Sequence, residues 1–300
     1  MRIAITTPTG NVGRKLTRIL LDQGGHNLAL LARDPSRLRE EQADGAEILQ
    51  GDLGDAAFVQ KATRGADALF WAIPPHYGAP DHLEYQKGIV RSGVQAVREN
   101  GIKHVVFLSS IGGHLPSGTG PITGLHVAEE EFARIAAGLT ILRPAFFMEN
   151  FLATVETVRQ ANSIFLPVPP EREIPMIATR DIAAAAAAAL TTQEISGKHI
   201  VPLHGFRDYS FAEVAQLLGK EMGAQINFVQ VGAEQTKDAI LKLGASDSVA
   251  DTMLELYQAM ANGRIRGEFP RSHESTTPTT FEEFARAILV PAVQATGATA

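Results

Sequence analysis

The stretch Met1–Gly13, MRIAITTPTGNVG, opens the chain with an apolar strand pattern that runs through a turn into a helix. Gly10 would let the backbone approach a pyrophosphate, and Gly13 would let the helix pack tightly on the strand. Thr7 stands where a three-glycine fingerprint has its first glycine. The stretch predicts a dinucleotide-binding turn, and the alternative is an ordinary strand-to-helix turn. The residues predicted to contact the nucleotide are Thr7, Thr9, Gly10, Asn11, Val12 and Gly13.

Short apolar strand patterns alternate with helical patterns downstream of this turn. The strand patterns cover Arg2–Thr6, Asn27–Ala32, Glu47–Gln50, Ala68–Ala72, His104–Leu108 and Leu139–Leu142. The helical patterns cover Val12–Gln23, Ala56–Thr63, Leu83–Asn100 and Leu125–Ala136. Strands that are apolar on both faces fit a sheet covered by helices on both sides. We therefore predict an α/β protein with a Rossmann-like, doubly wound parallel sheet.

The strand–helix alternation weakens after Arg143-Pro144, where we predict a smaller C-terminal α+β substrate domain. The predicted division is 1–150 for the Rossmann domain and 151–300 for the smaller one, with some later segments returning to the Rossmann sheet. Helices are predicted at Thr179–Leu190, from the capping-box residue Ser210 to Gly219 or Gly223, and at Ala233–Leu243, Ser246–Asn262 and Phe281–Leu289. The tail Pro291–Ala300 is expected to fray.

The end of the second strand predicts the choice of cofactor. Proteins of this fold that prefer NAD(H) place an acidic residue there to bind the ribose hydroxyls. The first polar residue here is Arg33, with Arg37 one helical turn later. A guanidinium binds a 2′-phosphate through paired hydrogen bonds, which predicts NADP(H) in preference to NAD(H). Two solvated surface arginines are the alternative, and Asp34 could still contact the ribose.

Further cofactor contacts are predicted where the next three strands end. Asp52 could lie near the adenine edge, although Asp52 or Asp55 could instead cap the following helix. The full set of these positions is Asp52, Leu53, Ala72, Ile73, Pro74 and Ser109. The Pro/Gly-rich loop Pro74–Asp81, which holds His76, is expected to be a mobile surface loop, and folding over the cofactor is the alternative.

Composition argues against several other classes of protein. The net charge of −6 gives no basic footprint for nucleic acid, and the absence of cysteine removes disulfides and thiolate chemistry. The nine histidines show no metal-ligand spacing, so no metal site is predicted. The N-terminus has no signal-peptide pattern, and the longest apolar run, Ile182–Leu190, is too short to span a membrane. We therefore expect a soluble, cytoplasmic protein.

Taken together, these stretches resemble the NmrA-like branch of the atypical short-chain dehydrogenase/reductase family. The matching stretches are Thr7–Gly13, Leu31–Pro35, Gly51–Leu53, Val105–Ser110, Leu142–Phe151, Arg180–Ala183 and Ile226–Val231. The likeness covers the chain to about Val231 and fades after it. The resemblance implies NADP(H) in the cleft between the two domains, with Phe146, Phe147 and Met148 lining a substrate pocket. The alternative for each of these three side chains is plain core packing.

The catalytic pair of classical members of the family is missing. They use Tyr-x-x-x-Lys, but the residues four positions after the tyrosines here are Asp81, Ile89, Glu213 and Ala261. The resemblance places His126 near the lysine position, where it could donate a proton and line the substrate pocket. A helix-start histidine without a chemical role is the alternative. Glu129, Glu130 and Glu131 are expected in a first helical turn, where the helix dipole favours negative charge.

These observations favour an NADPH-dependent oxidoreductase that transfers hydride to a small planar apolar acceptor such as a quinone. A quinone accepts hydride directly and can take its proton from water, so it needs no Tyr-x-x-x-Lys pair. The main alternative is a non-enzymatic NADP(H)-binding redox sensor or transcriptional co-regulator of NmrA type, which would act on a protein partner. A reductase or isomerase of the isoflavone-reductase type is a third option, although that type keeps a lysine where His126 falls. A homodimer is one option for assembly.

Overall fold

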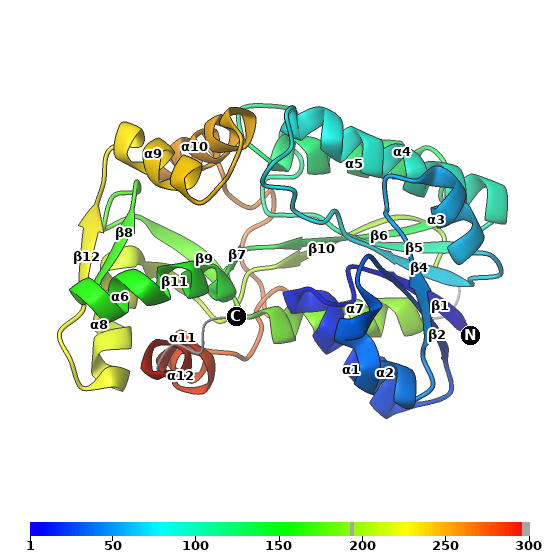
Figure 1. Ribbon diagram of the computed structural model, residues 1–300, viewed down its shortest axis with the longest axis horizontal. Helices are drawn as coiled ribbons and strands as arrows, with labels where there is room; N and C mark the ends of the chain where they lie inside the picture. Colours follow the sequence, from blue (N-terminus) through cyan, green and yellow to red (C-terminus); the bar gives the residue numbers. More distant parts are fainter. Residues whose placement is uncertain (193–194, 296–300) are drawn as a thin grey trace.

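A seven-stranded parallel sheet forms the centre of the computed structural model, which describes residues 1–192 and 195–295. Its strand order is β10-β6-β5-β4-β1-β2-β3 (Figure 1). The strands are β1 (Arg2–Thr6), β2 (Asn27–Ala32), β3 (Glu47–Gln50), β4 (Ala68–Trp71), β5 (His104–Leu108), β6 (Gly138–Pro144) and β10 (Gly197–Leu203). The order reverses between β1 and β4, and the predicted Rossmann-like doubly wound sheet is confirmed.

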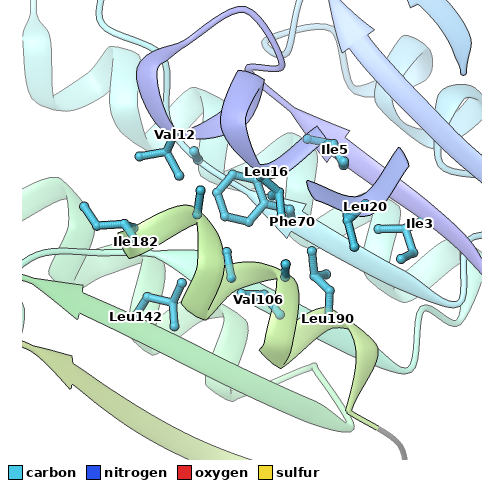
Figure 2. Packing of buried hydrophobic residues seen from close by; sticks show 14 of the residues in the cluster. Ile3, Ile5, Val12, Leu16, Leu20, Phe70, Val106, Leu142, Ile182 and Leu190 are labelled. Carbon is cyan, nitrogen blue, oxygen red and sulfur yellow. The ribbon is translucent and has the colours of Figure 1, made fainter. Parts of the chain in front are cut away.

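Helices cover both faces of this sheet. On one face lie α1 (Asn11–Gln23), α2 (Arg39–Ala43) and α7 (Thr179–Thr191), and on the other lie α3 (Ala56–Ala62), α4 (His82–Asn100) and α5 (Ile122–Ala133) (Figure 1). Figure 2 shows the first face, where Leu16 and Leu20 of α1 meet Phe70 of β4 and where α7 packs on the same strands. The small alanine side chains of α7 let this helix lie close to α1.

The later half of the chain builds two small sheets beside the large one. Strands β7 (Phe146–Phe147), β9 (Glu173–Ile177) and β11 (Asp208–Ser210) form one, and β8 (Ser163–Leu166) pairs with β12 (Asn227–Gln230). The helical elements around them are η2 (Met148–Thr154), α6 (Val155–Ala161), α8 (Phe211–Met222), α9 (Ala233–Lys242), α10 (Asp247–Ala261), α11 (Phe281–Phe284), η3 (Ala285–Leu289) and α12 (Val290–Gln294). Because α7 and β10 join the large sheet, segments from both sides of residue 150 build it.

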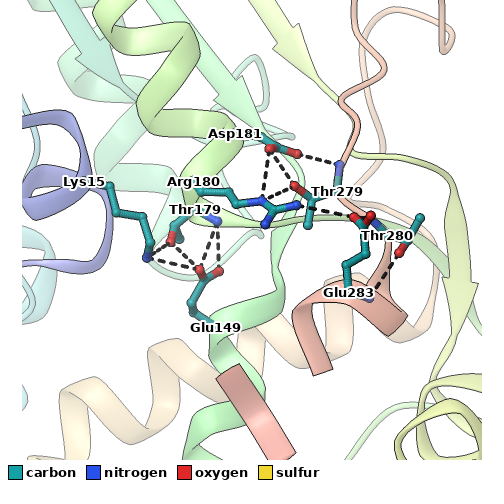
Figure 3. A network of polar contacts seen from close by, with 8 residues as sticks. All are labelled: Lys15, Glu149, Thr179, Arg180, Asp181, Thr279, Thr280 and Glu283. Carbon is teal, nitrogen blue, oxygen red and sulfur yellow. Dashed lines mark hydrogen bonds and ion pairs between the residues drawn. The ribbon is translucent and has the colours of Figure 1, made fainter. Parts of the chain in front are cut away.

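Two hydrogen-bonded groups tie α7 to the later elements (Figure 3). The buried Glu149 carboxylate accepts from the Thr179 backbone amide at 2.9 Å, and Lys15 of α1 lies 3.4 Å from the same carboxylate. Negative charge at the start of α7 is favoured by the helix dipole. Two residues later, Asp181 accepts from the amide and hydroxyl of Thr279. These contacts fix the later part of the chain against the Rossmann sheet.

Two predicted helices differ from the structure in their bounds, and strands β7 to β12 were not predicted as strands. Helix α5 begins at Ile122, three residues before the predicted start, and ends at Ala133. The last helix does not fray at Pro291 but continues as α12 to Gln294, and its Val293 side chain is buried. Pro291 cannot donate a backbone hydrogen bond, and the π-helical turn at Ala285–Leu289 directly precedes α12. The last part of the predicted tail, 296–300, lies outside the described residues.

Candidate functional site

The turn after β1 adopts the backbone path of a phosphate-binding turn. Thr7 has a φ of +51°, the left-handed region that a first glycine would supply at no steric cost. A Cβ placed on Gly13 would lie 2.1 Å from the Thr7 carbonyl oxygen, so this position excludes every larger residue. The turn therefore keeps the shape of the fingerprint although one glycine is replaced, at a cost of about 1 kcal/mol for Thr7.

The start of α1 offers unused donors to an anion. Gly10 is its N-cap and supplies no side-chain cap, while the Arg14 amide is the first to bond back along the helix, to the Gly10 carbonyl. Helix N-termini of this kind bind phosphate. The site lies beside the crevice between the carboxyl ends of β1 and β4, which is where ligands bind in open α/β sheets. These features fit a dinucleotide pyrophosphate.

Of the charged residues after β2, Asp34 caps the following helical turn, whereas Arg33 and Arg37 are exposed to solvent. The Asp34 carboxylate accepts from the Ser36 amide at 3.0 Å and from its hydroxyl at 2.6 Å. These hydrogen bonds lower the pKa of Asp34 below its ordinary value. Arg33 and Arg37 are exposed and form no ion pair with any residue in the described ranges. Asp34 is thus engaged in capping, whereas both guanidinium groups can receive a ligand.

The residues after β3 separate into one exposed and one buried side chain. The exposed Asp52 accepts from the Gly54 amide at 2.7 Å, and Asp55 is the N-cap of α3. Leu53, predicted to contact the cofactor, instead packs its side chain in the core beneath the sheet. It is buried because it lies between α3 and α4, where its carbonyl accepts a hydrogen bond from Ser92.

An apolar cavity of about 380 Å³ opens where β4 and β5 end. Ile73, Pro74 and Ser109, which follow β4 and β5, line it, and so do Phe146 and Phe147 of β7. None of the residues that line it is Asp, Glu, Lys or Arg. Met148 does not reach the cavity, because its fully buried side chain packs in the core of the later half of the chain. The lining suits an uncharged, apolar group.

A buried polar group stands behind this cavity. The Ser109 hydroxyl donates to Glu129 at 2.5 Å, and Arg143 donates to both oxygens of that carboxylate, at 3.0 and 2.5 Å. Arg143 also pairs with Glu268. Burial opposes the charge on Arg143, but the two carboxylates outweigh it and raise the pKa of the guanidinium. Because the Ser109 proton is held by Glu129, the hydroxyl presents only an acceptor to the cavity.

Helix α5 presents one face to the cavity, and His126 lies off that face. Ile122 and Leu125 face the cavity, and Glu129 follows on the same helical face rather than in the first turn. His126 does not line the cavity. Its Nδ1 lies 2.9 Å from the Gly113 carbonyl oxygen, in the turn that follows β5. The structure therefore gives His126 a place in holding that turn, away from the predicted substrate pocket.

The loop after β4 forms a wall of the cavity and is fixed at both ends. The Ser246 amide donates to the Tyr77 carbonyl at 2.9 Å, the Ser246 hydroxyl donates to the Ala79 carbonyl at 2.6 Å, and the His82 amide donates to Ser248. Pro74, Pro75 and His76 line the cavity. The loop lies at the surface, as expected, with Tyr77 exposed, and Ser246 and Ser248, far away in sequence, bind it through hydrogen bonds. Burial lowers the pKa of His82, which also lines the cavity.

The sequence prediction missed the wall contributed by α10 and the segment after it. The side chains concerned are Val249, Thr252, Met253, Leu256, Met260 and Ile265. Their apolar spacing predicted a helix but not its position against the cavity. Gln86 and Asn150 add polar groups to the lining and were also missed. No local signal could have found them, because the cavity joins segments that lie far apart in sequence.

Among the residues that the structure describes, no group of three or more His, Asp or Glu side chains is arranged to hold a metal ion. Over the same ranges, no helix combines the length and apolarity that crossing a bilayer requires.

The fold and the turn at Thr7–Gly13 define the class as a Rossmann-like protein with an apolar cavity at the carboxyl ends of its central strands. The model of the NmrA-like family matches residues 1–285. The chain belongs to the NmrA-like family. The match continues well past Val231, so the resemblance extends further than the sequence motifs indicated, and it includes the α10 wall of the cavity.

Curated relatives and solved structures resemble the chain over most of its length. An NAD(P)H azoreductase of Xenophilus azovorans is 29% identical, covering 95% of this chain and 97% of the relative. Quinone oxidoreductase 2 of Escherichia coli is 24% identical, covering 88% and 89% of the two chains. The crystal structure of an NADPH-dependent quinone oxidoreductase from Escherichia coli with NADPH superposes with a TM-score of 0.80 at 22% identity, covering 94% and 98%.

Proposed function

We propose that this protein is an NADPH-dependent oxidoreductase that reduces a small, planar, apolar acceptor such as a quinone. The observation that carries the proposal is the uncharged cavity of about 380 Å³ at the ends of β4 and β5, next to the dinucleotide turn. The family relatives support an oxidoreductase, since they include an azoreductase whose name gives NAD(P)H and a quinone oxidoreductase. The exposed Arg33 supports the choice of NADPH.

The residues of the site position the reactants and exclude water. The bound nicotinamide would supply the hydride. Phe146 and Phe147 would hold the ring of the acceptor, and Ile73 and Pro74 would support the cofactor side of the cavity. Ser109 would accept a hydrogen bond from the hydroxyl of the reduced product, because its own proton is engaged by Glu129. A quinone fits this site, because hydride transfer gives a hydroquinone anion that can take its one remaining proton from water when the product leaves the site.

The proposal is tested by following NADPH oxidation with purified protein and a panel of quinones, together with an azo dye. Quinone-dependent oxidation is the expected result. A parallel fluorescence titration measures NADPH and NADH binding. Tight NADPH binding without turnover on any acceptor would overturn the enzyme proposal in favour of a redox sensor. Turnover on the azo dye alone would reject a quinone as the acceptor but would still support an NADPH-dependent oxidoreductase.

The cofactor preference yields a direct prediction for Arg33. We expect Arg33→Ala to weaken NADPH binding by about 2 kcal/mol, or roughly thirtyfold, with little effect on NADH. The reason is the loss of paired, charge-assisted hydrogen bonds to the 2′-phosphate. Titrations of both nucleotides measure the difference. Arg39→Ala is the matched control, because it removes an equally exposed charge from the adjoining helix. Equal losses for NADPH and NADH in Arg33→Ala would contradict the assignment.

A further inference from the structure

A second cavity of about 330 Å³ adjoins the apolar one. Five residues line both, which makes the two spaces neighbours across a shared wall. They are Ile111, Ile174, Pro175, Met260 and Ile265. We call this second space the annex. The two spaces therefore lie side by side.

The annex differs from the apolar cavity in its charge. Arg172, Arg266 and Arg271 line it, whereas no Arg or Lys lines the apolar cavity. Its two carboxylates are Glu173 and Asp208. Asp208 pairs with Arg271, which leaves two arginines facing one carboxylate. The annex is therefore a cationic space beside a neutral one.

The other two arginines, Arg172 and Arg266, have N–H donors without a hydrogen-bond partner in the described ranges. Arg172 donates one Nη2 bond to the Ala261 carbonyl at 2.6 Å, but its buried Nε has no acceptor. A buried donor without an acceptor is costly, and an anion would satisfy it. Arg266 is exposed, and within the described ranges neither Arg172 nor Arg266 forms an ion pair. A planar anionic group such as carboxylate or sulfonate matches the guanidinium geometry.

We propose that the acceptor carries an anionic substituent, with its ring in the apolar cavity and its carboxylate, sulfonate or phosphate in the annex against Arg172 and Arg266. This inference rests on the proposed function, because it names the substrate class of the same site. It divides recognition into two parts. The apolar cavity selects a flat ring, and the annex selects the charge attached to it.

The test compares two ligands that differ in charge alone. Naphthalenesulfonate and the neutral naphthalenesulfonamide are titrated calorimetrically into the protein saturated with NADP⁺. We expect the sulfonate to bind about tenfold more tightly, and Arg266→Gln to remove most of that preference. Arg264→Gln is the matched control, since Arg264 lies two residues away, donates to the Ser117 carbonyl and does not line the annex. Arg172→Lys tests the buried guanidinium while keeping its charge.

Three results would overturn the proposal: equal affinity for the two ligands, an unchanged preference in Arg266→Gln, or an equal loss in Arg264→Gln. Inorganic sulfate distinguishes a free anion from a substituent. If sulfate stabilises the protein through Arg266 while the sulfonate shows no preference, the annex binds free anions and the substrate proposal fails. Because the titration needs no turnover, its failure is separate from failure of the oxidoreductase assay. Quinone reduction with no preference for charge would keep the proposed function and reject the annex.

Discussion

Gly13→Ala is expected to lower the free energy of unfolding by about 2 kcal/mol and to weaken NADPH binding by roughly a hundredfold. The new methyl group would meet the Thr7 carbonyl oxygen at 2.1 Å, its carbon at 2.9 Å and the Pro8 Cα at 3.1 Å. All three are backbone atoms, so no side chain can rotate away. The turn would have to move by about 1 Å, which displaces the groups that face the pyrophosphate. Urea unfolding and an NADPH titration measure the two losses.

The matched control is the same substitution at another helical glycine. Gly88 lies inside α4, where the nearest neighbour to an added Cβ is an Arg91 nitrogen at 3.8 Å. Gly88→Ala is therefore expected to stabilise the protein by about 0.5–1 kcal/mol, because alanine is the better helix former. A stable Gly13→Ala protein that binds NADPH normally would show that the close approach at Thr7 is not needed.

The Rossmann half could be predicted because its signals are local. Strands β1, β2, β3 and β5 have the predicted bounds, since each is a short apolar run closed by turn residues. Strand β10 was missed, because Lys198, His199 and Pro202 interrupt its apolar pattern. Pairing with β6 forms this strand at the edge of the sheet, where a proline is tolerated. Strand β10 therefore forms because it pairs with β6, and its own residues do not predict it.

The candidate site also has parts with local sequence signals and parts that depend on the whole fold. The turn at Gly10 and Gly13 has its cause within a few residues, and so does the Asp34 cap, which Pro35 and Ser36 could have indicated. The place of His126 came from the resemblance, whereas the helical spacing puts Ile122 and Leu125, and not His126, on the face that meets the cavity. The annex and the α10 wall need contacts across the whole chain. Sequence reasoning had no local signal for them.

Glu129→Gln is expected to lower the free energy of unfolding by about 3 kcal/mol. The Glu129 side chain is 3% exposed, and Arg143, its partner through two hydrogen bonds, is 7% exposed. Glutamine keeps the shape but removes the charge, so Arg143 would keep only Glu268, which is partly exposed. A buried guanidinium left with incomplete compensation is strongly destabilising. Urea or thermal unfolding at neutral pH measures the change.

Glu131→Gln is the control for this prediction, because Glu131 lies on the same helix but pairs with Arg134 at the surface. Exposed pairs contribute little, so its loss should stay below about 1 kcal/mol. A second readout separates structure from chemistry in Glu129→Gln. The glutamine amide can donate to Ser109, which frees the serine proton to point into the cavity. We therefore expect the KM for a quinone to change while the affinity for NADPH is kept. Equal stability losses in the two variants would contradict the role of Glu129 as the buried counter-charge of Arg143. An unchanged KM in Glu129→Gln would contradict its role in orienting the Ser109 hydroxyl.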